Sequence, residues 1–135
     1  MTFRTFDHKA DIGIIGIGNT KEEAFAEAAK CMFNVMTDVN KVRHVREFHF
    51  TVTAQREEEL FVEFLNALIS QSSLKDMFFS SFKVKIKGEH LDCLYAGESI
   101  SEKHEFKTEV KAATYSQVKV EKKNGKFHVQ CILDL

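Results

Sequence analysis

Two segments of this chain have apolar residues at helical spacing, and alternating segments border both of them. The first begins at about Lys21, where Thr20 and Glu23 have the spacing of an N-terminal capping box, and should run to about Thr37. The second begins near Arg56, before three glutamates that complement the positive end of a helix, and should end in the polar stretch 70–73. Their apolar stripes consist of Phe25, Ala28, Ala29, Met32, Val35 and Met36, and of Leu60, Phe61, Phe64, Leu65, Leu68 and Ile69.

The alternating segments predict β-strands. We expect strands over 3–7, 11–18, 48–54, 82–87 and 91–96, one or two more within 108–121, and a last strand over 127–134. Gly88-Glu89 and Asn124-Gly125 are expected to form turns, and residues 98–107 a loop. In the last strand one face should be apolar and consists of Phe127, Val129, Cys131 and Leu133. The pattern predicts a single α+β domain over 1–135, with two layers: two helices packed on a largely antiparallel sheet.

Composition limits the class of protein. A chain of 135 residues is long enough for one domain with a real core. Its net charge of −1 argues against tight, nonspecific binding of nucleic acid by the whole surface. The three cysteines are widely spaced without a CxxC pair, which favours a reducing compartment over a disulfide scaffold. No signal peptide or membrane-length apolar segment is present, so we expect a soluble, cytoplasmic protein.

Aspartates near both ends of the chain are the main candidates for a functional site. These are Asp7, Asp11 and Asp134. Terminal strands of small sheets often lie side by side, which would bring Asp11 and Asp134 within a few ångströms. Two carboxylates at that distance repel unless a proton or a cation lies between them, and Leu135 could add a main-chain oxygen. An all-oxygen set selects Ca²⁺ or Mg²⁺ over zinc. The alternative is that the aspartates occupy solvated strand ends or turns.

Other polar residues have a functional and a structural interpretation. His8 could act as a general acid–base group or a metal ligand, or be a hydrogen-bonded structural residue. Lys111 could contact a partner or an anionic group, or be an exposed strand lysine. The cysteines Cys31, Cys93 and Cys131 fall on apolar phases and are expected in the core rather than as nucleophiles.

Two further patterns are interpreted structurally. The glycines at 13, 16 and 18 match neither dinucleotide-binding nor Walker A spacing, so strand bulges, turns or close backbone contacts explain them better than phosphate binding. Two groups of lysines could contact RNA phosphates or an acidic partner, and a solvated face or a protected edge strand explains them equally well. The structural interpretation is favoured, because no stacking aromatic residues accompany the lysines. These groups are Lys83, Lys85 and Lys87, and Lys119, Lys122, Lys123 and Lys126.

In these segments the chain resembles the archease family. The resemblance covers nearly the whole chain, in order, and the combination of its first and fourth segments is specific. The segments are 6–13 (FDHKADIG), 18–29 around GNT and EAF, 60–66 (LFVEFLN), 109–115 (EVKAATY) and the terminal 132–135 (ILDL). Lys9 departs from the pattern, because the family usually carries Thr there.

The resemblance implies an accessory protein rather than an enzyme. Its partner would be the catalytic subunit of the tRNA-splicing ligase, which joins an RNA 3′-phosphate to a 5′-hydroxyl using GTP, and it would promote ligase guanylylation and multiple turnover. The family's metal site, commonly assigned to calcium, maps onto Asp11, Asp134 and Leu135; Mg²⁺ or Mn²⁺ are alternatives. Asp7, His8 and Lys111 would belong to an activating surface. Contact with RNA would be indirect. Two alternatives stay open: a small metal-dependent phosphate-ester hydrolase, and an RNA-binding chaperone for tRNA processing.

Overall fold

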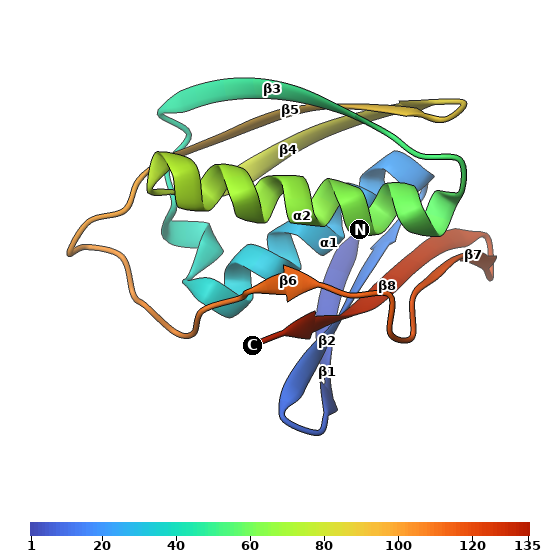
Figure 1. Cartoon of the computed structure of the whole chain (residues 1–135), viewed down its shortest axis with the longest axis horizontal. Helices are drawn as coiled ribbons and strands as arrows, with labels where there is room; N and C mark the ends of the chain where they lie inside the picture. Colours follow the sequence, from blue (N-terminus) through green and yellow to red (C-terminus); the bar gives the residue numbers. More distant parts are fainter.

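The computed structural model describes residues 1–135, and it places two helices between two β-sheets (Figure 1). The helices are α1 (Lys21–Met36) and α2 (Glu57–Lys75), with a short 3₁₀ helix, η1 (Val39–Lys41), after α1. The five-stranded sheet has the order β1-β2-β8-β6, with β7 also paired to β8, and the three-stranded sheet has the order β3-β5-β4. The strands are β1 (Thr2–His8), β2 (Asp11–Gly18), β3 (Arg46–Thr53), β4 (Met77–Lys87), β5 (His90–Ser99), β6 (Ala112–Ala113), β7 (Lys119–Lys123) and β8 (Lys126–Asp134).

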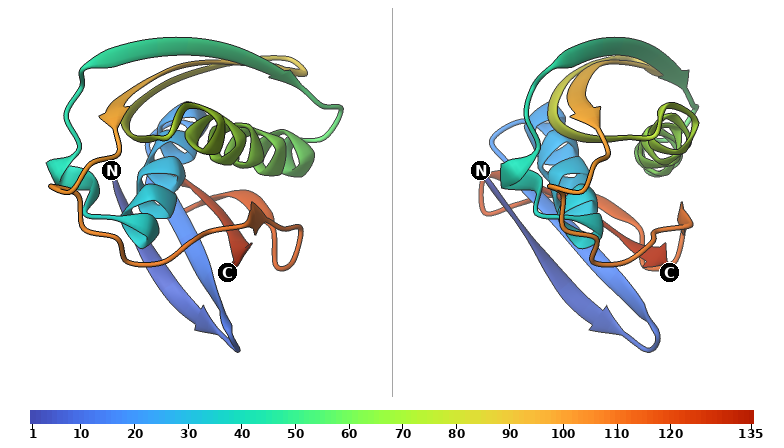
Figure 2. Two further views of the ribbon diagram at one scale, coloured as in Figure 1. Left: turned by 60° about the vertical axis from the view of Figure 1, so that its left-hand side comes forward. Right: turned by 90° about the vertical axis from the view of Figure 1, so that its left-hand side faces the viewer.

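The α+β class and the antiparallel pairing are confirmed, since every strand pair in both sheets is antiparallel. The strands form two sheets rather than the single sheet that the sequence pattern predicts, and α1 packs on both of them, against β2 on one side and β4 on the other. Figure 2 shows the three-stranded sheet curving over the helices while the five-stranded sheet lies beneath them.

The start of α1 forms as the capping box predicts. The hydroxyl oxygen of Thr20 accepts a hydrogen bond from the backbone N–H of Glu23 (3.1 Å). The helix then lies directly on β2, because Gly16 has no side chain: a Cβ atom there would lie 2.2 Å from the carbonyl oxygen of Ala24. Close backbone contact therefore explains this glycine, which is neither in a bulge nor in a turn.

Aromatic side chains fill the space between the helices and the sheets. The ring of Phe25 on α1 lies 5.0 Å from that of Phe61 and 5.8 Å from that of Phe64, both on α2. On the same helix, Phe33 contacts Phe79 and Phe82 of β4. Phe25, Phe33, Phe61 and Phe64 are completely buried, so α1 joins the second helix and the second sheet in one core.

Several expected boundaries are wrong; β5, for example, continues to Ser99, into the stretch expected to be a loop. Helix α2 continues through the polar stretch 70–73 and ends at Lys75, because Asp76 adopts the left-handed conformation that closes a helix. The hydroxyl of buried Ser72 donates to the carbonyl of Met77 (2.6 Å), so a serine is accommodated in the last turn. Strand β4 begins at Met77 rather than at Phe82, since a β-bulge between Phe79 and Ser81 interrupts the alternation that sequence reasoning relies on.

The long connection between β5 and β6, residues 100–111, is fixed to the end of α1. The hydroxyl of Thr37 donates to the carbonyl of Glu105 (2.6 Å), and the backbone N–H of Lys107 donates to the carbonyl of Met36 (2.9 Å). The ammonium of Lys107 also donates to the carbonyl of Asn34 (3.0 Å). The two bonds from Lys107 satisfy carbonyls that the end of α1 leaves without partners.

A buried carboxylate, Glu98, holds the start of the same connection. It accepts hydrogen bonds from the backbone N–H of Arg43 (2.8 Å), from Lys103 Nζ (2.7 Å) and from His104 Nε2 (3.1 Å). His104 Nδ1 accepts from the backbone N–H of Ser101 (3.0 Å), so Nε2 carries the proton. Burial alone would raise the pKa of Glu98, but these hydrogen bonds outweigh it and lower the pKa to about 2.

The lowered pKa of Glu98 makes this anchor sensitive to acid. Its contribution to stability is complete above the carboxyl's ordinary pKa of 4.5 and is lost as pH falls towards about 2. We expect Glu98→Gln to lower the free energy of unfolding at pH 7 by about 1–3 kcal/mol. Denaturant titrations at pH 7, 4 and 2.5 test this, and the difference between wild type and variant should shrink as pH falls. A difference independent of pH would contradict the role given to the carboxylate charge.

Candidate metal centre

His8, Asp11 and Asp134 form one row across the five-stranded sheet. His8 and Asp11 are directly opposed across the β1–β2 pair, which a two-residue turn at Lys9-Ala10 closes. On the other side of β2, Ile12 is opposite Leu133 in the antiparallel β2–β8 pair. Asp11 and Asp134 are the next residues outward on these two strands, so they face each other at the end of the pair. Directly opposed residues point to the same face of a sheet, with Cβ atoms about 4.5–5.5 Å apart. The sheet therefore brings together the two carboxylates that are 123 positions apart in sequence.

The end of β8 closes this row with main-chain atoms. The backbone N–H of Leu135 donates to Asp11 Oδ1 (3.4 Å). On the other edge, the carbonyl of Asp134 accepts from the backbone N–H of Lys111 (2.8 Å), next to the Ala112–Asp134 pair of β6 and β8. The expected neighbourhood of Asp11, Asp134 and Leu135 is thus present, although β8 pairs with β2 and not with the first strand of the chain.

Asp7 and Lys111 do not share the face of this row. Asp7 opposes Ile12, and Ile12 opposes Leu133, whose side chain is completely buried on the core side. Alternation along the strands therefore sends Asp7 to the opposite face from Asp11. Lys111 joins the row only through its backbone, and its exposed side chain borders a separate pocket.

The row supplies carboxylate oxygens, which hard cations prefer, but its three side chains do not form a metal-binding group by themselves. Neither Asp11 nor Asp134 takes part in an ion pair, so the neighbouring carboxylates have no protein cation between them. His8 Nδ1 is buried and has no hydrogen-bond partner, which is unusual for a buried polar atom. No group of three His, Cys, Asp or Glu side chains that could hold a metal is present, so any cation here would also need main-chain oxygen and water.

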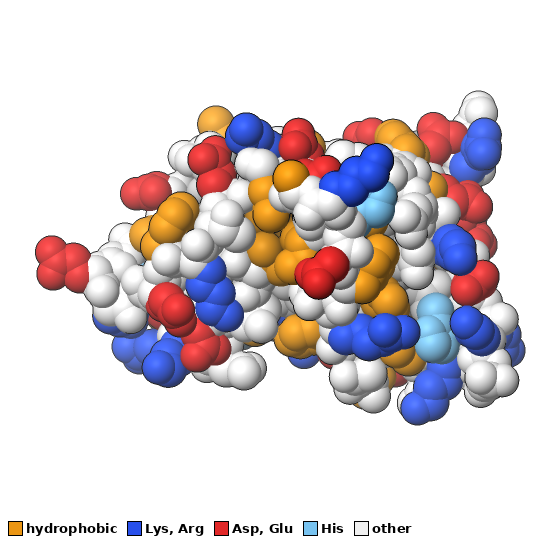
Figure 3. All heavy atoms as spheres, turned by 90° about the horizontal axis from the view of Figure 1, so that it is seen from below, with side chains coloured by type: hydrophobic (Ala, Val, Ile, Leu, Met, Phe, Trp, Pro, Cys, Tyr) orange, Lys and Arg blue, Asp and Glu red, His pale blue; other side chains and the backbone are white.

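The β1–β2 hairpin makes this region prominent. In Figures 1 and 2 the tip of the hairpin extends beyond the rest of the molecule, close to the end of β8. Figure 3 views the molecule from below, where hydrophobic side chains run through the middle of the surface and charged side chains of both signs surround them. The row of His8, Asp11 and Asp134, called the acidic row below, therefore lies at the tip of a protruding hairpin, because His8 and Asp11 flank its turn.

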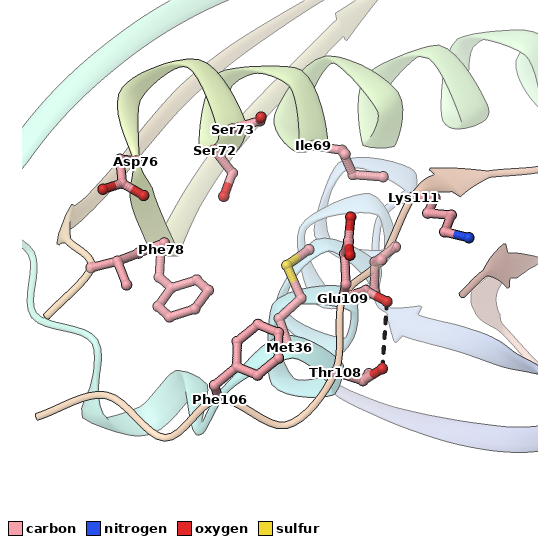
Figure 4. Close-up of a pocket in the computed structure, with 12 residues that line it drawn as sticks. Met36, Ile69, Ser72, Ser73, Asp76, Phe78, Phe106, Thr108, Glu109 and Lys111 are labelled. Atoms are coloured by element: carbon pink, nitrogen blue, oxygen red, sulfur yellow. Dashed lines mark hydrogen bonds between the residues drawn. The ribbon is translucent and has the colours of Figure 1, made fainter. Parts of the chain in front are cut away.

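A pocket that sequence reasoning did not identify lies next to Lys111. Its volume is about 390 Å³, and it lies between the C-terminal halves of both helices and the 100–111 connection (Figure 4). Its walls combine apolar side chains with polar ones, including Met36, Ile69, Phe106, Ser73, Glu109 and Lys111. No sequence pattern indicates this pocket, because its lining comes from three segments that are far apart in the chain.

The cysteines lie in the core, as the sequence pattern predicts. Cys31, Cys93 and Cys131 are free and buried, and burial raises the pKa of each thiol to about 12, which leaves them unreactive. Neither helix combines the length and the apolar character that crossing a membrane requires.

The fold is that of a small α+β protein in which two helices lie between two antiparallel sheets. A model of the Archease protein family matches residues 3–135. The chain is 38% identical to protein archease of Pyrococcus abyssi over 136 residues, 96% of each chain, and 36% identical to protein archease of Methanothermobacter thermautotrophicus over 137 residues, 98% of each. The chain therefore belongs to the archease family.

Solved structures agree with this assignment. The solution structure of Methanobacterium thermoautotrophicum protein 1598 matches with a TM-score of 0.83 and 33% identity, covering 98% of each chain. The crystal structure of an archease from Thermotoga maritima, described as a possible chaperone, matches with a TM-score of 0.65. At 21% identity the second likeness, which covers 98% of this chain and 96% of that one, shows a shared fold.

Proposed function

We propose that this protein is a nonenzymatic activator of the GTP-dependent tRNA-splicing RNA ligase and promotes guanylylation and multiple turnover of its catalytic subunit. Membership of the archease family supports the choice of partner. The observation that carries the proposal is the row of His8, Asp11 and Asp134 at the tip of a protruding hairpin. A protruding acidic element can enter the active-site cleft of another protein, which a flat surface cannot.

In this proposal Asp11, Asp134 and the main-chain oxygen of Leu135 hold a divalent cation, with Ca²⁺ preferred and Mg²⁺ or Mn²⁺ as alternatives. Ca²⁺ takes about 6–8 oxygen ligands, so three protein residues leave positions for water or for a partner's oxygen atoms. A bound cation supplies positive charge that stabilises phosphate oxygens during nucleotidyl transfer. The residues themselves position the ion: Asp11 is held by the N–H of Leu135, and Asp134 by its place in β8.

Asp7, His8 and Lys111 have different roles in the proposed activating surface. His8 lies in the row opposite Asp11, and its Nδ1 is buried without a hydrogen-bond partner. Asp7 projects from the other face of the hairpin, and Lys111 lies at the edge of the 390 Å³ pocket. Contact with the ligase would therefore extend from the hairpin, past the end of β8, to the pocket.

The direct test is a turnover assay of the RNA ligase with limiting enzyme, GTP and an RNA that carries a 3′-phosphate and a 5′-hydroxyl. We expect that adding this protein will raise ligase guanylylation and allow many turnovers where the ligase alone completes few. Equal guanylylation and turnover with and without the protein would contradict the proposal.

Two further measurements distinguish this function from two others. Release of phosphate from RNA or nucleotides by this protein alone would favour a metal-dependent hydrolase. The Thermotoga maritima relative is described as a possible chaperone, which makes a chaperone role the second candidate. Suppression of thermal aggregation of unrelated proteins, without any effect on ligase turnover, would favour that role.

A further inference from the structure

The three-stranded sheet has one open face with a row of lysines along its edge. Both helices lie on the other side of this sheet (Figure 1). The open face contains three cross-strand rows that each end in a lysine of β4. These rows are His49–Leu94–Lys83, Thr51–Asp92–Lys85 and Thr53–His90–Lys87.

The lysines on this face have no anionic partner. Lys83, Lys85 and Lys87 are exposed, and none of them takes part in an ion pair. The one carboxylate in the rows, Asp92, turns to the opposite strand: its Oδ1 accepts from the hydroxyl of Thr51 (2.7 Å) and lies 3.4 Å from His49 Nε2. The positive charge of the three ammonium groups is therefore available to a ligand.

The surface between the strands is hollowed. A cavity of about 380 Å³ is lined by His49, Lys83, Lys85, Asp92 and Leu94. Leu94 forms an apolar floor between a lysine on one side and an imidazole on the other. A solvated lysine face, which is how the sequence pattern alone is interpreted, accounts for the charges but not for a hollow with an apolar floor.

We propose that this face binds the phosphodiester backbone of single-stranded RNA. Alternate residues of a strand are about 6.8 Å apart, which is comparable to the separation of successive phosphates along an extended strand. Lys83, Lys85 and Lys87 can thus contact successive phosphates, while the His49 and His90 rings offer planar groups on which bases stack. The carboxylates of an acidic peptide would pair with the lysines, but they would not stack on the imidazoles or pack on the apolar floor.

This site is separate from the acidic row. The three-stranded sheet and the end of β8 lie on opposite sides of the helices (Figures 1 and 2). RNA bound on the sheet would therefore leave the β1–β2 hairpin free for a protein partner. The inference does not depend on the proposed ligase function, and it is tested with this protein alone.

The experiment measures fluorescence anisotropy of a labelled oligouridylate titrated with the purified protein at several salt concentrations. With about three phosphate contacts on a single strand, we expect the logarithm of the binding constant to fall with a slope of about −2 against the logarithm of salt concentration. That slope corresponds to roughly 20-fold weaker binding at 200 mM than at 50 mM salt. Absence of binding at 50 mM salt would overturn the proposal.

Two matched triple variants identify the surface. The first is Lys83→Glu, Lys85→Glu and Lys87→Glu on β4; the second is Lys119→Glu, Lys123→Glu and Lys126→Glu on the β7–β8 hairpin, with the same change of net charge. Both variants should keep the wild-type circular dichroism spectrum, since all six side chains are exposed. We expect the β4 variant to bind RNA at least 10-fold more weakly and the hairpin variant to bind within twofold of wild type. Equal losses in both variants, or displacement of RNA by polyglutamate as effective as by unlabelled RNA, would overturn the site.

Discussion

Replacing both Asp11 and Asp134 with asparagine is expected to abolish divalent-cation binding and ligase stimulation while leaving the fold intact. Asparagine keeps an oxygen that can accept the hydrogen bond from the N–H of Leu135, so the end of β8 should stay in place. The change removes both side-chain negative charges from the site. Because Ca²⁺ affinity depends strongly on the charge of the ligands, we expect its affinity to fall by roughly 100-fold or more.

Calorimetric titration with CaCl₂ and the ligase turnover assay measure the two effects of this double variant. The matched control is Glu89→Gln with Glu121→Gln, two exposed carboxylates with no ion pair that lie outside the row. The control should bind Ca²⁺ and stimulate the ligase as wild type does. Full stimulation by the Asp11→Asn, Asp134→Asn protein would remove the acidic row from the mechanism, and unchanged Ca²⁺ affinity would place the cation elsewhere.

Phe25→Ala is expected to be the most destabilising single substitution considered for this fold. The ring is completely buried and contacts Phe61 and Phe64 across the helix pair. Removing a buried phenylalanine ring costs about 3–5 kcal/mol, because apolar burial is lost and a cavity is left. That is a large fraction of the total stability of a domain, which is about 5–15 kcal/mol.

Urea titrations followed by circular dichroism measure this effect. Phe106→Ala is the matched control, since the same ring is removed at a position that is 72% exposed. The control should change the free energy of unfolding by less than about 0.5 kcal/mol. Similar losses for Phe25→Ala and Phe106→Ala would show that the helix pair does not depend on the buried aromatic cluster.

Sequence patterns predicted the elements of this fold where one periodicity runs without interruption. The stripe of α1, its capping box and the alternation of β8 each predict the element that is observed, with Val129, Cys131 and Leu133 buried on one face. The predictions were wrong at the end of α2 and at the start of β4. There a left-handed residue, Asp76, and a bulge after Phe79 set the boundaries, and neither leaves a periodic signal.

Residue types alone predicted part of the candidate site. Aspartates near both chain ends indicated an oxygen-ligand site, and the structure places Asp11 beside the end of β8 as expected. Sequence proximity was misleading for Asp7, because adjacent residues of a strand point to opposite faces. The lysines of β4 were recognised as one face, but the histidines of β3 and β5 that share it could not be recognised without the pairing.

The sequence by itself determined the two amphipathic helices, the strand faces and the chemical character of the site, because these depend on side-chain type and local spacing. Only the tertiary structure decided that the strands form two sheets, that β8 pairs with β2, and that His8, Asp11 and Asp134 share one row. Strand order and register arise from packing both sheets against α1. That packing joins residues more than a hundred positions apart, and no local pattern in the chain records it.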